Sequence, residues 1–134
     1  KEINPKIKVI GCLPENAPVM YECLKAGKII NVSESPTLSD GTAGGLDEDS
    51  ITFEICQKYI DDFILVNEQE IADGMRFVIE NHRQIVEGSA GVTIAAFLKE
   101  KEKFAGKNSA LIMCGGNVSF EKLQKIIHRD GGNN

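Results

Sequence analysis

Apolar and polar residues alternate along this chain in two kinds of pattern. Short runs rich in Val, Ile and Leu occupy residues 7–13, 62–66 and 109–114. Runs of this length and composition are typical of strands buried on both faces of a parallel sheet. Segments with helical periodicity lie between them. The sequence therefore predicts an α/β fold, in which a short parallel sheet is flanked by helices in three layers.

Capping residues mark the ends of several predicted helices. Gly27 follows the helical segment 19–26 and is typical of a C-cap. Asn67 and Glu70 form a capping-box pattern at the start of another helix. Ser119 is placed to cap a last helix that ends near residue 127. These residues predict helix ends independently of the hydrophobic pattern.

Apolar positions also support two further predicted helices. In the helix over about 51–60, Ile51, Ile55 and Tyr59 recur at helical spacing. Residues 89–98 are apolar almost all round and include several small side chains. Such a helix is expected to be buried and to pack backbone-close against a neighbour.

Residues 28–50 show no periodicity and contain Gly41, Gly44 and Gly45. A loop of this length inside a compact domain is usually functional or disordered. An acidic cluster at 47–49 precedes the helix that follows, where negative charge is favoured. We expect residues 1–127 to form one domain part and residues 128–134 a tail.

Composition excludes several classes of function. The chain has 134 residues and a net charge of −5. This charge argues against nucleic-acid binding, which needs a basic surface. No apolar run reaches the roughly 18–20 residues of a membrane span, and we see no signal peptide. The first residues, KEINPK, are typical of a helix end, so we expect the chain to be a piece of a longer protein.

The four cysteines stand singly in apolar contexts, at positions 12, 23, 56 and 114. None belongs to a C-x-x-C pair, which argues against zinc. Their number permits disulfides, but we expect reduced thiols in a cytoplasmic protein.

The segment Cys114–Asn117 is a candidate binding site. Ligands of open α/β sheets bind beyond the carboxyl ends of the strands, and these residues follow the predicted strand 109–114. Gly115 and Gly116 allow close approach of the backbone to a ligand. The Cys114 thiol can hydrogen-bond a ring nitrogen or act as a nucleophile. The structural alternative is a buried cysteine followed by a tight turn.

Glu87 is a second candidate, in the stretch EGSAG at a predicted helix start. Its carboxylate can serve a cofactor or cap the helix. Neither G-x-G-x-x-G nor G-x-x-x-x-G-K-[ST] occurs in the chain. The glycines are therefore not a recognised phosphate-binding motif.

Four stretches together resemble one enzyme family. They are TLSDGTAGG (37–45), YIDDFILVNEQEIADGM (59–75), VEGSAGVTIAAFL (86–98) and LIMCGGNVSF (111–120). In this order and spacing they resemble the C-terminal part of the serine/threonine dehydratases. These are pyridoxal-phosphate enzymes of the tryptophan-synthase-β fold type, which also include serine racemase. The resemblance covers about residues 5–127.

The resemblance implies roles for six residues. The family residue at the Cys114 position is a serine or cysteine that hydrogen-bonds the pyridine nitrogen of the cofactor. A neutral group there leaves the ring a weaker electron sink, which can favour loss of water. Glu87 matches a carboxylate near the ring and Gly41 a loop beside the substrate. Gly115, Gly116 and Asn117 would shape the cofactor-facing turn.

The chain also departs from the family pattern. The Schiff-base lysine and the glycine-rich phosphate loop of the family lie upstream of the matched region. We therefore expect no catalytic residue in this chain and no covalently bound pyridoxal phosphate. Some relatives bind a divalent metal through acidic residues after the first strand. Leu13 and Val19 stand at those positions, so we expect no metal.

The parent protein is accordingly expected to be an L-threonine/L-serine ammonia-lyase with pyridoxal 5'-phosphate and a small hydroxy-amino acid substrate. Its expected partners are the missing N-terminal half and further copies in a homo-oligomer, with neither nucleic acid nor membrane. A serine racemase or hydroxyaspartate dehydratase fits these residues nearly as well. A stand-alone, non-catalytic α/β binding or interaction module is the alternative from another class.

Overall fold

The computed structural model describes residues 1–128. Two parallel strands, β1 (Ile10–Pro14) and β2 (Asp62–Val66), pair in register from Ile10 opposite Asp62 to Pro14 opposite Val66. The helices are α1 (Val19–Ala26), the 3-10 turn η1 (Asp40–Thr42), α2 (Ile51–Tyr59), α3 (Glu68–His82), α4 (Gly88–Lys99), α5 (Lys101–Phe104) and α6 (Phe120–Ile127). Of the predicted tail, residues 129–134 lie outside the described residues.

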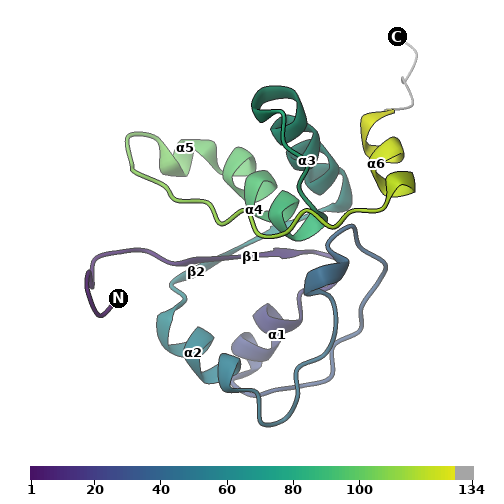
Figure 1. Cartoon of the computed structure of the whole chain (residues 1–134). Coiled ribbons are helices and arrows are strands. Elements are labelled where there is room, and N and C mark those ends of the chain that lie inside the picture. The colour runs from purple at the N-terminus through teal and green to yellow at the C-terminus, as the bar shows by residue number, and fades with distance from the viewer. Residues whose placement is uncertain (129–134) are drawn as a thin grey trace.

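The predicted α/β fold with three layers is confirmed. Figure 1 shows α3 and α4 on one side of the two strands and α1 and α2 on the other. Ile10, Cys12, Ile64 and Val66 point toward the α3–α4 side, where they join the main hydrophobic cluster. A smaller cluster around Val19, Cys23 and Phe53 lies on the α1–α2 side.

The small residues of α4 are buried, as predicted. A Cβ atom added at Gly74 of α3 would lie 2.7 Å from the carbonyl oxygen of Gly91 in α4. Met75 is 1 % exposed and packs directly over Gly91. The α3–α4 pair therefore approaches backbone to backbone, as neighbours with small side chains can.

Helix α2 is present at the predicted range, and its buried face is the one that carries Phe53. Phe53 is the buried side chain of α2, whereas Ile51 and Ile55 are 76 % and 52 % exposed. Helix α1 is the helix that packs against α2. The aromatic ring of Phe53 fills that contact, so the isoleucine face is left toward solvent.

The predicted third strand at 109–114 is wrong. The segment is extended but pairs with no strand among the described residues. A hollow of about 640 Å³ separates it from β1, and its lining includes Ile10, Cys12 and Leu111. Ile112 and Met113 are 70 % and 44 % exposed. A strand needs a hydrogen-bonded neighbour, and nothing in the described part of the chain lies close enough to be one.

The first strand starts later than predicted, because Ile7 is half-exposed and pairing begins at Ile10. The capping box of Asn67 and Glu70 is present, and Ser119 accepts from the Lys122 amide at the start of α6. Within residues 1–128, no helix is long and apolar enough to cross a membrane.

Candidate functional site

Glu87 lies at the centre of the candidate site, at the residue before α4. Its Oε1 accepts a hydrogen bond from the Ser89 hydroxyl at 2.6 Å. Its Oε2 accepts from the backbone N–H of Asn117 at 3.1 Å. The side chain makes no capping bond to α4. Glu87 therefore occupies the N-cap position of α4, but its carboxylate joins the helix start to a distant turn instead of capping a helix amide.

The turn that follows Cys114 wraps around this carboxylate. Gly115 has φ of +79°, and a Cβ atom there would overlap the Glu87 carboxylate. Its carbonyl oxygen also accepts from the Glu87 N–H at 3.3 Å. A Cβ atom at Gly116 would lie 3.2 Å from the Ile85 carbonyl oxygen. Only a residue without a side chain fits at 115, because both the backbone angle and the space require glycine.

Cys114 itself is exposed. The structural alternative of a buried cysteine is therefore wrong, although the tight turn is present. The turn residues on either side of it are also exposed, whereas Glu87 is half-buried. The candidate site is thus an open face of the described chain, and it is separate from the hollow beside β1.

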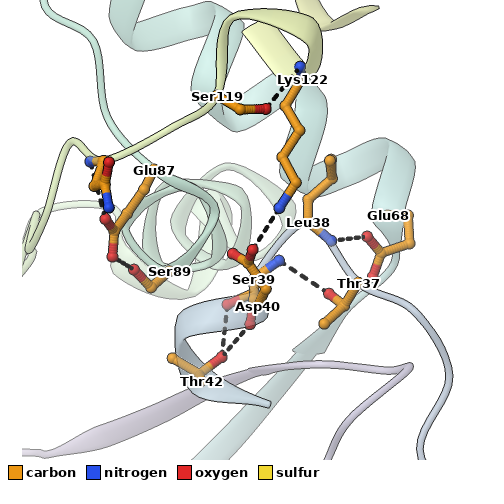
Figure 2. Close-up of polar contacts among 11 residues, drawn as sticks. Thr37, Leu38, Ser39, Asp40, Thr42, Glu68, Glu87, Ser89, Ser119 and Lys122 are labelled. Atoms are coloured by element: carbon orange, nitrogen blue, oxygen red, sulfur yellow. Dashed lines mark hydrogen bonds and ion pairs between the residues drawn. The ribbon is translucent and has the colours of Figure 1, made fainter.

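Gly41 reaches the same place from the long loop 28–50. A Cβ atom at Gly41 would lie 3.4 Å from Glu87 Oε1 and 3.9 Å from the Ser89 hydroxyl. Figure 2 shows the loop end and the turn on two sides of Glu87 and Ser89. The fold therefore brings Gly41, Glu87, Gly115 and Asn117 together from three separate parts of the sequence.

On the side that faces α3 and α4, polar contacts hold the end of the loop 28–50. The Leu38 N–H donates to Oε2 of Glu68 at 2.6 Å, and the fully buried Ser39 hydroxyl hydrogen-bonds the Thr42 hydroxyl at 2.6 Å. A Cβ atom at Gly88 would overlap the Leu38 carbonyl group. The backbone of the loop is therefore pressed against the start of α4.

Asp40 is held from outside by Lys122 of α6, whose ammonium donates to Oδ2 of Asp40 at 2.5 Å (Figure 2). This hydrogen bond lowers the pKa of the Asp40 carboxyl below its usual value. Sequence reasoning missed Asp40, Ser89 and Lys122. The Asp40–Lys122 pair spans 82 residues, and no periodicity or short motif links positions so far apart.

The described residues contain no group of three or more His, Cys, Asp or Glu side chains placed to hold a metal. Val19 is buried in the α1–α2 cluster and Leu13 is half-buried in β1. Neither side chain has a donor atom for a metal. The absence of a metal nevertheless stays a prediction.

A family model and the similar proteins of known sequence point to the same enzyme family. The family model described as "Pyridoxal-phosphate dependent enzyme" matches residues 1–115. An "L-threonine ammonia-lyase" of Thermotoga maritima is 39 % identical over 129 residues, which are 96 % of this chain and 32 % of the relative.

Two solved structures are similar in fold. A processed form of threonine deaminase isoform 2 from Solanum lycopersicum has a TM-score of 0.83 and 34 % identity, and the match covers 94 % of this chain and 37 % of that one. A serine racemase from Dictyostelium discoideum has a TM-score of 0.77 and 36 % identity, covering 89 % and 38 %. The chain spans about a third of the length of the relatives it matches. By family model, sequence and fold, this chain belongs to the pyridoxal-phosphate dependent enzymes.

Proposed function

We propose that this chain is the C-terminal part of an ammonia-lyase that acts on L-threonine or L-serine. The reaction eliminates water from the hydroxy-amino acid; hydrolysis of the resulting imine then consumes one water and releases ammonia and a 2-oxo acid. The observation that carries the proposal is the convergence of Gly41, Gly115 and Asn117 on Glu87. It is supported by the L-threonine ammonia-lyase among the similar proteins.

The residues present fit the ring of pyridoxal phosphate. The glycines at 41 and 115 let two segments of backbone lie directly against the Glu87 carboxylate, and the exposed Cys114 thiol stands next to one of them. When bound, the cofactor supplies the electron sink that stabilises the negative charge left after loss of the substrate's α-proton. In this arrangement the Cys114 thiol would hydrogen-bond the ring nitrogen, and the Glu87 carboxylate would lie near the ring. Gly41 lies on the substrate side.

We further propose that the rest of the protein completes the site. The unpaired edge of β1 and the hollow beside it offer room for a neighbouring strand. The catalytic lysine and the phosphate loop would come from that missing part, so this chain alone is inactive. Borohydride reduction of this chain with pyridoxal phosphate, followed by mass spectrometry, should label no single lysine stoichiometrically.

The decisive experiment uses the complete protein that contains this chain. We expect the visible absorbance band of bound pyridoxal phosphate and release of a 2-oxo acid from L-threonine or L-serine. Neither signal should survive Glu87→Leu, whereas Glu121→Leu on the exposed part of α6 should retain both. A complete protein that binds no pyridoxal phosphate would refute the proposed function and favour the non-catalytic module.

A second candidate is racemisation of serine, favoured by the similarity to the Dictyostelium serine racemase. A hydroxyaspartate dehydratase fits the same residues. Chiral chromatography of the products from L-serine, L-threonine and hydroxyaspartate separates these activities. Formation of D-serine from L-serine, with no 2-oxo acid, would contradict the ammonia-lyase and favour the racemase.

We propose a homo-oligomer working in the cytoplasm. The support for self-association is the exposed apolar surface, which includes Ile51 and Ile55 on α2 and Phe120 on α6. The support for the cytoplasm is the set of four free thiols. Light scattering coupled to size-exclusion chromatography tests the first, and a concentration-independent monomer would contradict it.

A further inference from the structure

The loop that carries Gly41 is attached unequally at its two sides. On the inner side, Leu38 and Ser39 are held by Glu68, by Thr42 and by close contact with Gly88. On the outer side, the ammonium of Lys122 holds the Asp40 side chain. Gly41 follows Asp40 directly, so this outer tether acts one residue away from the glycine that lies against Glu87.

Lys122 extends from a helix that is itself anchored. The Ser119 hydroxyl accepts from the Lys122 N–H at 3.3 Å and caps the helix start. Ile126 is 3 % exposed, and its carbonyl oxygen accepts two hydrogen bonds from the Arg76 guanidinium, at 3.0 and 2.6 Å. The base of the lysine is therefore fixed relative to α3, while its ammonium reaches Asp40.

We propose that Lys122 is a positioning residue for the substrate side of the site. Its ion pair with Asp40 holds the Gly41 loop against Glu87, opposite the Gly115–Asn117 turn. The inference rests on the proposed function and adds to it a residue that touches neither cofactor nor substrate. Loss of the pair leaves the fold intact and loosens the wall that contacts the substrate.

The strength of this tether is modest. The side chains of Lys122 and Asp40 are 37 % and 68 % exposed, so water and salt screen their attraction. An exposed pair of this kind is worth up to about 1 kcal/mol, which corresponds to a change of about fivefold in an equilibrium. The pair therefore adjusts the position of the loop without carrying the stability of the domain.

The test compares Lys122→Met and Lys122→Arg in the complete protein, with Lys125→Met as the control. Lys125 is on the same helix, is exposed and has no ion pair within the described part of the chain. We expect Lys122→Met to raise KM for the hydroxy-amino acid about threefold to fivefold with kcat nearly unchanged. Lys122→Arg keeps a positive charge at this position, so its KM should stay close to that of the wild type. Lys125→Met should have the KM and kcat of the wild type.

A second measurement needs neither cofactor nor activity. Amide hydrogen exchange of this chain, followed by mass spectrometry, reports on the bonds from Thr42 N–H to Ser39 and from Ala43 N–H to Asp40. Lys122→Met should speed exchange at these amides about threefold to fivefold and leave α3 unchanged. Added salt should also speed exchange at these amides in the wild type, because it screens the ion pair. It should change their exchange little in Lys122→Met, which has no ion pair to screen.

Several outcomes would overturn the inference. Unchanged KM and unchanged exchange in Lys122→Met would show that the tether does not position the loop. A parallel fall in kcat and thermal stability, with KM unchanged, would show a structural role instead. If the wild type binds no cofactor and forms no product, the proposed function fails, and the exchange experiment still decides whether Lys122 holds the loop.

Discussion

The α3–α4 contact and the segment 109–119 both carry apolar side chains but differ in what surrounds them. Between α3 and α4, backbone meets backbone at Gly74 and Gly91, and Met75 is fully buried. In the segment 109–119, Ile112 is 70 % exposed, and the preceding residues 109–111 line a hollow beside β1. The α3–α4 contact finds its neighbours inside this chain, whereas the segment 109–119 presents Ile112 and Met113 to solvent. An apolar run is therefore evidence of contact, but it does not say which part of a protein supplies the contact.

The largest expected effect is at the α3–α4 contact. Gly74→Val places side-chain atoms against the backbone of Gly91 and Ala95, which cannot move aside without separating the helices. We expect a loss of about 3 kcal/mol in the free energy of unfolding, measured by urea denaturation. Gly45→Val is the control, because a Cβ atom at Gly45 meets nothing within 4 Å. Equal losses in the two variants would contradict backbone-close packing.

The next effect distinguishes space from backbone angle in the site turn. Gly115 and Gly106 have φ of +79° and +72°, but only at Gly115 does an added Cβ overlap the Glu87 carboxylate. Gly106→Ala should cost about 1 kcal/mol for the left-handed backbone. Gly115→Ala should cost about 1–2 kcal/mol more, because Glu87 loses its bond to Asn117. Urea unfolding of both variants measures the difference, and identical values would sink the proposed crowding at Glu87.

A third substitution asks whether the segment 109–119 is buried elsewhere. Ile112→Ser should change the stability of this chain by less than about 0.5 kcal/mol, because the side chain is already exposed. In the complete protein the same change should cost about 1.5–3 kcal/mol if the proposed missing part covers Ile112. Chemical denaturation of both proteins provides the comparison. A small effect in both proteins would show that Ile112 is exposed in the complete protein as well.

The smallest effect concerns the start of β1. Asp61 accepts from the Val9 N–H at 2.8 Å and pairs with Lys1 and Lys8. The hydrogen bond from Lys1, followed by that from Val9, lowers the pKa of Asp61 from 3.8 to about 2. Its stabilising contribution is thus present above pH 3.8 and is lost as the pH falls toward 2. Asp61→Asn should flatten the pH dependence of unfolding in this window, and Asp49→Asn should not.

The sequence predicted elements wherever local chemistry decides them. The capping box at Asn67 and Glu70, the Gly27 C-cap and the small residues of α4 all act within one or two turns, and all are confirmed. The apolar pattern at 109–114 predicted a strand, but a strand also needs a second strand to pair with. The apolar pattern of the segment itself does not show whether such a partner is present. The buried face of α2 likewise depends on a neighbour, since Phe53 packs against Val19 and Cys23 of α1.

In the candidate site, too, most residues in short motifs were predicted, and the residues joined by the long-range ion pair were not. Cys114, Glu87 and Gly41 were chosen from short motifs and a family resemblance, and the fold brings Gly41, Glu87 and the turn after Cys114 together. Their roles toward a cofactor stay predictions. Ser89 stands two residues from Glu87, so its position within EGSAG was a usable signal. Nothing in the sequence pointed to Lys122, because its partner Asp40 lies 82 residues away.

The meeting of three chain segments at Glu87 has a consequence for the time course of folding. Asn117 contacts Glu87 across 30 residues, and Lys122 contacts Asp40 across 82. Contacts between distant positions form slowly, because the intervening chain must be closed into a loop first. We expect the α3–α4 pair to form early and the surroundings of Glu87 to form last. A ligand captured at Glu87 would then select molecules in which all of the preceding steps have succeeded.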